Sequence, residues 1–562
     1  MERRTFAVAA VIAGVVMGLL GNMLFYGREI GISFPIYILL SVALVLILGR
    51  AARRPVNRRN LWVLLPLAFF AVMVAVRADS LILTLNVLSV LTLGAIGLYY
   101  LPTKQAMDTE PLGEHTKGVI EAGILVMPAA LAETLEAWAW LREKRHQRGG
   151  VLAAVVRGGV FALPVVLVFA VLLGSADAVF ASYVNQAFDG VRRALGIEFL
   201  GDTMTRTLMI AGFGIAVTGS LGYGLRLQAA PVLAVVPPVR QPDEDSVDET
   251  VIVDDKPKAK PGFKLSMVES SIIMGSVVAL FAAFVVVQFA YFFGGERTLE
   301  MSNLSYAQYA RRGFFELVAV SVMTLGLSLI LDHVSVRQSK RENTVFRVLA
   351  LLIVGLTSIM LVSASQRMWL YEEAFGFTQL RVYTHVFMLW LGVLFGFFVL
   401  AVFRLRMNIF SLGVVLAIIG YLVTLNVMNV DRYIAERNIA RYHDGQELDI
   451  AFLNILSPDA VEPILALWQE SGEGTEVHTW SGQWLAKQLN TLSPEVKQTG
   501  QLPFSLNFSR MDAWLMLDRV SRQLPAYDPS LYWGSYYSSY SESRSDYGSG
   551  WDAVSTASPG SR

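Results

Sequence analysis

The stretch Tyr383–Phe403, YTHVFMLWLGVLFGFFVLAVF, decides the fold, because it contains no Asp, Glu, Lys or Arg. It has about the length that an α-helix needs to cross roughly 30 Å of hydrocarbon. The whole chain shares this character. Of its 562 residues 54% are hydrophobic and only 16% are charged, whereas about a quarter of the residues of a soluble chain are charged. The composition therefore favours a membrane protein over a large soluble core.

Apolar runs of similar length recur along the chain and predict an all-α, polytopic membrane protein with about eleven transmembrane helices. The predicted spans are 5–26, 32–49, 61–77, 81–101, 157–175, 205–226, 270–294, 315–332, 347–365, 383–403 and 408–428. The first span is too long for a signal peptide and lacks a small-residue cleavage site, so it is interpreted as an anchor.

Basic residues predict the orientation of the chain in the cell membrane. The richest runs, RAARRPVNRR (Arg50–Arg59), LREKRHQR (Leu141–Arg148) and VRQSKRE (Val336–Glu342), all fall on one side. Because cytoplasmic loops are rich in Lys and Arg, the N-terminus is predicted to be cytoplasmic. An odd number of spans then puts the C-terminus outside.

Changes in composition divide the chain. Residues 1–226 form a membrane region of six spans, 227–264 a disordered cytoplasmic linker rich in proline and charge, and 265–430 a membrane region of five spans. Residues 431–524 carry apolar residues at helical spacing and predict a small extracytoplasmic helical domain. The Ser/Tyr/Gly-rich tail, 525–562, predicts disorder. Residues 116–148 suit a cytoplasmic interfacial helix, with a re-entrant hairpin as the alternative.

Polar side chains gather where several predicted spans end on the outer side. LSYAQYARRGFFEL (Leu304–Leu317) places Arg312 and Glu316 one helical turn apart. An internal ion pair that docks the helix, a site for a ligand, and arginines that simply snorkel toward water are all consistent with this pattern. The candidate ligand-binding residues of this outer-face cluster are Asp177, Tyr306, Tyr309, Arg311, Arg312, Glu316, Arg367, Tyr371, Glu372, Arg381, His385, Asp431 and Arg432.

Four of these polar segments carry a family resemblance. They are SADAVF (Ser175–Phe180), LSYAQYARRGFFEL, RMWLYEEAFGFTQLRVYT (Arg367–Thr384) and DRYIAERNIARY (Asp431–Tyr442). Together they resemble a bacterial membrane-protein family known as a domain of unknown function, the 4173 type, with a related 4153 type. The resemblance implies a polytopic protein and supplies no activity and no catalytic residues.

The sequence lacks the residues and motifs that several kinds of functional site require. The chain has no cysteine and only six scattered histidines, so neither a metal site nor a cofactor is predicted. It also lacks a phosphate-binding loop, and its balanced charge of zero does not suggest nucleic acid as a partner. The motifs GVVMG (Gly14–Gly18) and GVLFG (Gly392–Gly396) predict close packing between helices of one chain.

Three functions remain open. A non-enzymatic protein would bind an anionic small molecule or lipid at the outer arginines and tyrosines, because guanidinium groups suit phosphate and carboxylate. A sensor or scaffold would bind a protein partner through the outer helical domain. A membrane-embedded enzyme on a lipid-linked substrate would use acid or base groups such as Glu316, Glu372, Asp177 and His385.

Overall fold

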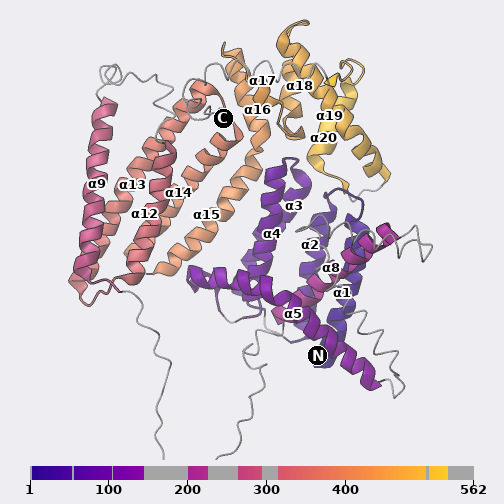
Figure 1. The fold of residues 1–562 in the computed structure, drawn as a ribbon, viewed down its shortest axis with the longest axis horizontal. Coiled ribbons are helices and arrows are strands. Elements are labelled where there is room, and N and C mark those ends of the chain that lie inside the picture. Colours follow the sequence, from indigo (N-terminus) through magenta and orange to yellow (C-terminus); the bar gives the residue numbers. More distant parts are fainter. Residues whose placement is uncertain are drawn as a thin grey trace, which may run out of the picture.

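The protein is all-α. The computed structural model describes residues 3–53, 56–103, 105–144, 200–225, 264–293, 314–404, 406–501 and 505–529. Within these ranges the one β-contact is an isolated bridge between Leu265 and Ser335. Eleven of the described helices are long and apolar enough to cross a membrane. The predicted class, a polytopic helical membrane protein with a C-terminal helical part, is therefore confirmed (Figure 1).

Two groups of helices make up the membrane region (Figure 1). The N-terminal group contains α1 (Arg3–Phe25), α2 (Ser33–Ala51), η1 (Arg58–Val63), α3 (Leu64–Val76), α4 (Ser80–Tyr100), η2 (Met107–Thr109), α5 (Leu112–Lys144) and α8 (Leu200–Leu225). The C-terminal group contains α9 (Met267–Phe293), α12 (Phe314–Val334), α13 (Lys340–Phe375), α14 (Gln379–Arg404) and α15 (Met407–Met428). Helix α15 packs on α14 and also contacts α3, α4 and α5, so it joins the two groups.

Ten of the predicted spans coincide with helices of these groups. The predicted span 157–175 lies outside the described residues. The eleventh candidate span is Leu112–Leu141 of α5, which meets the length and composition of a span. Figure 1 shows α5 running obliquely across the lower ends of the N-terminal helices that it packs against. An interfacial placement of this helix stays a prediction.

Close packing of α1 on α8 explains the first glycine motif. A Cβ added to Gly18 would lie 2.4 Å from the carbonyl oxygen of Ile210, and one added to Gly14 would lie 2.7 Å from that of Gly214. Only glycine lets the two backbones approach this closely. At Gly396 of the second motif, by contrast, no described atom lies within 4 Å of such a Cβ.

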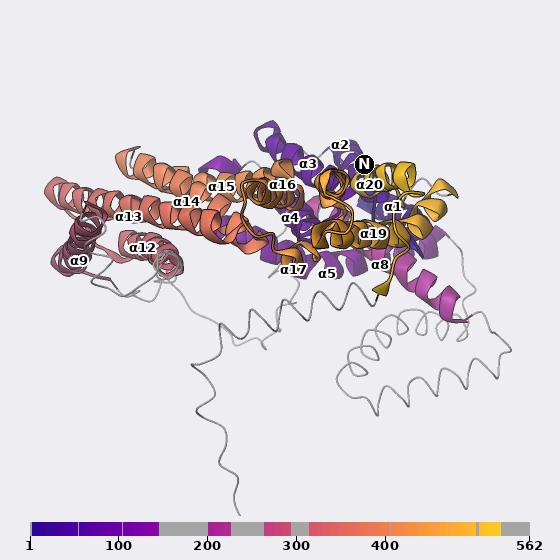
Figure 2. The same cartoon turned by 90° about the horizontal axis from the view of Figure 1, so that it is seen from above.

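The helical domain stands at one end of the membrane helices, which we call the domain-side end (Figures 1 and 2). Its elements are α16 (Val430–His443), α17 (Ile450–Leu453), η5 (Pro458–Ala460), α18 (Val461–Glu470), α19 (Glu476–Gln501) and α20 (Phe508–Val520). Asn429, with φ of +52°, turns the chain from α15 into α16; asparagine tolerates this left-handed conformation better than most residues. The predicted tail, 525–562, lies outside the described residues after Pro529, and the predicted linker lies outside them before Lys264.

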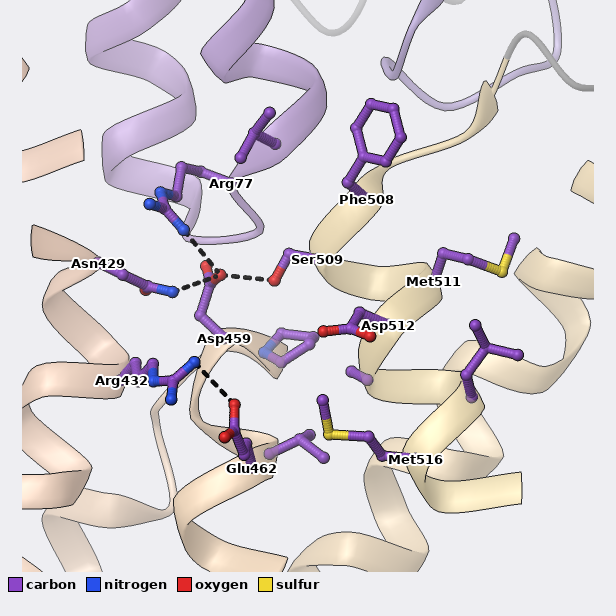
Figure 3. A pocket seen from close by; sticks show the side chains of 15 residues that line it. Arg77, Asn429, Arg432, Asp459, Glu462, Phe508, Ser509, Met511, Asp512 and Met516 are labelled. Atoms are coloured by element: carbon purple, nitrogen blue, oxygen red, sulfur yellow. Dashed lines mark hydrogen bonds and ion pairs between the residues drawn. The ribbon is translucent and has the colours of Figure 1, made fainter. Parts of the chain in front are cut away.

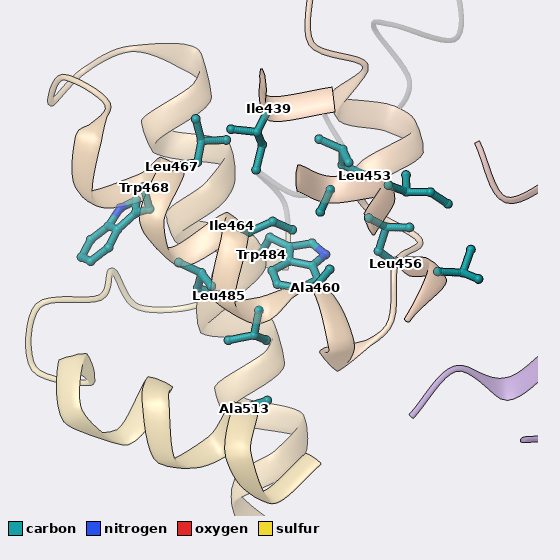
Figure 4. Close-up of a cluster of buried hydrophobic side chains, with 14 of the residues drawn as sticks. Ile439, Leu453, Leu456, Ala460, Ile464, Leu467, Trp468, Trp484, Leu485 and Ala513 are labelled. Atoms are coloured by element: carbon teal, nitrogen blue, oxygen red, sulfur yellow. The ribbon is translucent and has the colours of Figure 1, made fainter. Parts of the chain in front are cut away.

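Apolar side chains from all parts of the domain form its core (Figure 4). Trp484 and Leu485 of α19 are fully buried, and Ile464 and Leu467 of α18 pack with them. The same cluster continues into Val382 of α14. Burial of this kind contributes roughly 25 cal/mol per Å² of apolar surface. The domain therefore shares one core with the membrane helices beneath it.

The connection between α13 and α14 differs from the prediction. The sequence suggested a long loop after residue 365, but α13 continues to Phe375 and the loop is only Gly376–Thr378. The apolar run ends before the helix does, because residues 366–375 include charged side chains such as Arg367 and Glu373 and still belong to the helix. Helix α13 begins with a full capping box between Ser339 and Glu342.

Candidate functional site

The structure places the predicted site residues in separate groups. Asp177, Tyr306, Tyr309, Arg311 and Arg312 lie outside the described residues. Glu316 lies exposed in the first turn of α12, and its predicted ion pair with Arg312 stays a prediction. The other seven lie on α13, α14 and α16, all at the domain-side end.

Arg381 and Tyr371 meet at the C-terminal end of α13. The guanidinium carbon of Arg381 lies 4.2 Å from the centre of the Tyr371 ring, and its Nη1 donates to the carbonyl oxygens of Phe375 and Gly376. Arg441 of α16 donates to the carbonyl oxygens of Glu373 and Ala374. Positive groups suit a helix C-terminus, where carbonyl oxygens lack intrahelical partners. These contacts give Arg381 a structural role, and its role in ligand binding stays a prediction.

Asp431 and Gln379 join the domain to the membrane helices. Its side chain is buried at the start of α16, where Oδ1 accepts a hydrogen bond from Gln379 Nε2 at 2.7 Å. Oδ2 accepts one from the backbone N–H of Ser457 at 2.9 Å. The same Gln379 nitrogen lies 3.3 Å from Asp79 Oδ2, at the start of α4. One amide thus bridges two carboxylates that are distant in sequence.

Asp459 of η5 is a second buried carboxylate, and Figure 3 shows the groups directed toward it. Asn429 and Ser509 donate to its Oδ1, and Arg77 Nη1 lies 3.9 Å from the same oxygen. Ser509 belongs to α20 and Arg77 follows α3, so Asp459 connects the domain with the N-terminal group. A buried carboxylate that lacked these hydrogen bonds would destabilise the folded protein.

A cavity of about 440 Å³ adjoins Asp459, and we call it the domain-junction cavity (Figure 3). Its two arginines are already paired: Arg77 faces Asp459, and Arg432 Nη1 lies 2.7 Å from Glu462. Asp512 adds a further negative charge to the lining. Arg432 is thus held in an ion pair, and its role in ligand binding stays a prediction. An anionic ligand does not suit this cavity, because the positive charges have partners and the net charge of the lining is negative.

Burial shifts the pKa values of the groups around this junction. Desolvation raises the pKa of Asp79 to about 6, and the negative charges of Asp431 and Asp459 raise it further, against the hydrogen bond from the N–H of Ile82. Desolvation also lowers the pKa of Arg77, although Asp459 opposes this effect. The junction therefore holds a carboxyl group that titrates well above the usual range for aspartate.

A second cavity, of about 570 Å³, lies between α13 and α14 below α16, and we call it the α13–α14 cavity. Glu372 and His385 meet in its wall, with 3.1 Å between Glu372 Oε2 and His385 Nδ1. His385 Nε2 lies 3.2 Å from the hydroxyl oxygen of Ser365. The three side chains form a hydrogen-bonded row across two helices. Within the described chain, Arg437 is the only Lys or Arg that lines this cavity.

The rest of the lining of the α13–α14 cavity is apolar. Leu361, Met388 and Gly392 lie along the spans, whereas the polar row and Arg437 lie toward the domain. Val362 and Leu389 line the cavity and are 60% and 61% exposed, on helices that cross the membrane. The cavity therefore has an apolar part at the level of the spans and a polar end next to α16.

Sequence reasoning identified Glu372 and His385 as members of one cluster but missed Ser365, Arg437, Asp79 and Asp459. A signal existed for Asp79, because an aspartate directly before an apolar run is a typical helix N-cap, and its side chain caps α4. Ser365 precedes Glu372 by seven residues, which places both on one helix face. No local pattern marks Arg437 or Asp459.

Comparison with known proteins identifies a family for the chain. No curated protein and no solved structure matches the chain significantly. A family model described as Domain of unknown function (DUF4153) matches residues 64–467, which is more than half of the chain. The match runs from the start of α3 into α18 and leaves α1 and α2 outside it. The likeness to the 4173 type stays a prediction. The chain belongs to the DUF4153 family.

Proposed function

We propose that this multi-pass protein binds an anionic, lipid-like ligand in the α13–α14 cavity, at the outer face of a bacterial cell membrane. One observation carries the proposal: a single cavity combines an apolar lining within the spans with a polar end that contains Arg437. Its volume of about 570 Å³ lies in the range of ligand sites, roughly 300–1,000 Å³.

The position of Arg437 supports an anionic head group. Its guanidinium is exposed and lies 5.2 Å from the centre of the Tyr433 ring. Such a group holds phosphate or carboxylate with two hydrogen bonds. The acyl part of the ligand would lie between α13 and α14, where exposed Val362 and Leu389 face the hydrocarbon. Trp369, also in the lining, suits the membrane–water interface.

Binding of phosphatidylglycerol tests this proposal, with two glycines of α14 as a matched pair. Gly392 lines the cavity, and Gly396 lies one turn further along the helix outside it. A Cβ fits at both positions, since its nearest described neighbour at Gly392 is Leu361 Cδ2 at 3.8 Å. We expect Gly392→Leu to fill the cavity and lower the affinity at least tenfold, and Gly396→Leu to leave it unchanged. Native mass spectrometry of the purified protein, titrated with the lipid, measures both.

Replacing the arginine tests the head group separately. Arg437→Gln should abolish the preference for phosphatidylglycerol over phosphatidylethanolamine, whereas Arg519→Gln, at an exposed position on α20, should keep it. Equal affinities for Gly392→Leu and Gly396→Leu would overturn the proposal.

The alternative function, a scaffold that binds a partner through the helical domain, has less support. The buried polar groups of the domain, such as Asp431 and Asp459, fasten it to the membrane helices. Described residues of the domain line the domain-junction cavity and, through Tyr433 and Arg437, part of the α13–α14 cavity.

A further inference from the structure

The row Ser365–His385–Glu372 has the connectivity of a nucleophile, a base and an orienting carboxylate. With the imidazole proton on Nδ1, His385 donates to Glu372 Oε2 across 3.1 Å and accepts from the Ser365 hydroxyl across 3.2 Å. These are the contacts by which a histidine activates a serine hydroxyl. The arrangement is defined by geometry and not by sequence order, so it can arise on membrane helices.

The hydroxyl of Ser365 differs from other hydroxyls on the same helices. Thr357 and Ser358 of α13 donate to the carbonyl oxygens four residues earlier, as does Thr384 of α14. This is the usual contact of a hydroxyl within a helix. Ser365 instead faces the imidazole of the neighbouring helix. Its hydroxyl is therefore placed for chemistry with a base.

The burial of Glu372 and the partial exposure of His385 also fit these roles. The side chain of Glu372 is 3% exposed and that of His385 is 35% exposed, so the carboxylate is shielded while the imidazole reaches the cavity. A buried carboxylate fixes the tautomer of the histidine and stabilises the imidazolium that forms during proton transfer. All three side chains line the α13–α14 cavity.

We propose that Ser365 is the nucleophile of a serine hydrolase site that cleaves an acyl ester of a lipid held in this cavity. The idea rests on the proposed function, because the same cavity must hold the ester. Ser365 Oγ forms a bond to the ester carbonyl carbon, and its proton passes to His385 Nε2. The bond to the leaving alcohol breaks, and the alcohol takes that proton. Water then attacks the carbonyl carbon of the acyl-enzyme and gives a proton to His385 Nε2. The bond to Ser365 Oγ breaks, Ser365 takes that proton from His385, and a fatty acid is released.

Labelling with a fluorescent fluorophosphonate, which reacts with activated serines, tests this inference on the full-length protein in membranes. We expect wild-type protein to be labelled and Ser365→Ala to be unlabelled. His385→Gln should slow labelling at least a hundredfold, since a positioned base contributes typically 10²–10⁴-fold. Ser358→Ala is the matched control on the same helix, and its labelling should equal that of the wild type.

Binding of phosphatidylglycerol to each variant separates the two proposals. Ser365→Ala should still bind the lipid, because it removes only the hydroxyl, and that result also shows that the variant is folded. Absent labelling of wild-type protein that binds the lipid would overturn the hydrolase and leave the binding function standing. Labelling that persists in Ser365→Ala would also overturn the hydrolase, since another serine would then react. Equal lipid binding by Gly392→Leu and Gly396→Leu would overturn the binding function and, with it, the lipid ester as the substrate, whatever the labelling of Ser365 shows.

Discussion

Asp459 Oδ2 accepts a hydrogen bond from the backbone N–H of Ala78 at 2.9 Å, although the two residues are 381 positions apart. Ala78 lies in the turn between α3 and α4, and Asp459 lies in the helical domain. The contact is buried. It fixes the domain on the N-terminal helices, while the Asp431–Gln379 contact fixes it on α14. The domain thus clamps both groups of membrane helices at one end.

Asp459→Ala should loosen this clamp. The change leaves the partly buried Arg77 without its counter-ion and Ala78 N–H without its acceptor. Breaking a buried charged pair costs roughly 3–5 kcal/mol. We expect the free energy of unfolding, measured by SDS titration in lipid micelles, to fall by about 3 kcal/mol.

Glu462→Ala is the control for that variant. Glu462 pairs with Arg432 in the same cavity wall, but the two side chains are 50% and 42% exposed. Exposed ion pairs contribute about 0–1 kcal/mol, so its loss should be small. Equal losses for the two variants would show that the buried carboxylate does not hold the junction.

The pH dependence of stability should report the carboxyl group of Asp79. Its pKa is raised from 3.8 to about 6 in the folded protein, so folding favours the protonated form. This stabilisation is complete below the unfolded pKa and is lost as the pH rises through 6. Lowering the pH from 7 to 5 should therefore stabilise the wild type by roughly 1 kcal/mol more than Asp79→Asn. Asparagine also caps helices well, so α4 should keep its start.

SDS titrations of both proteins at pH 5 and pH 7 provide the four free energies that this comparison needs. Identical pH dependence in the two proteins would mean that Asp79 is ionised throughout and that the origin of any acid effect lies elsewhere.

The tight turn after α13 should require its glycine. Gly376 has φ of +78°, and an added Cβ would lie 2.6 Å from Asn438 Oδ1 and 2.7 Å from Arg441 Nη1. Asn438 also donates to and accepts from the backbone of Phe377, so it cannot move freely. Strain of this kind costs about 1–3 kcal/mol, and the displaced contacts add to it. Gly376→Ala should destabilise the protein by about 3 kcal/mol.

Gly445→Ala separates the two causes. Gly445 also has a positive φ, +89°, but no described atom lies within 4 Å of an added Cβ. Gly445→Ala should therefore cost only the strain of a positive φ at a non-glycine residue, roughly 1–2 kcal/mol. A cost for Gly376→Ala no larger than this would show that Asn438 and Arg441 yield without penalty.

The spans were predictable from the sequence because the membrane imposes one length and one polarity on every crossing helix. The extension of α13 to Phe375 was not, because hydropathy reports the apolar layer and not the hydrogen bonds that carry a helix beyond it. The sequence predicted that Glu372 and His385 belong to one cluster, but it did not predict the contact between them. Contacts such as Gln379 with Asp79 connect residues 300 positions apart, and no local pattern encodes them.

The residue type alone also does not predict whether an arginine caps a helix or lines a cavity. A guanidinium that suits a phosphate suits a row of carbonyl oxygens equally well, since both accept from its planar donors. Arg381 uses its donors to cap α13, whereas Arg437 lines a cavity. Their sequence surroundings, each near tyrosines and glutamates, do not distinguish these roles.

Single cysteines should establish the orientation, because the chain contains no native cysteine. Glu473 lies exposed in the domain, between α18 and α19. Arg341 lies exposed at the start of α13, at the end of this helix away from the domain. If the domain faces outward, Glu473→Cys should react with a membrane-impermeant maleimide on intact cells. Arg341→Cys should react only after the cells are permeabilised, because it belongs to the basic run predicted to be cytoplasmic. The reverse pattern would place the α13–α14 cavity at the cytoplasmic face, where its ligand would have to come from the inner leaflet.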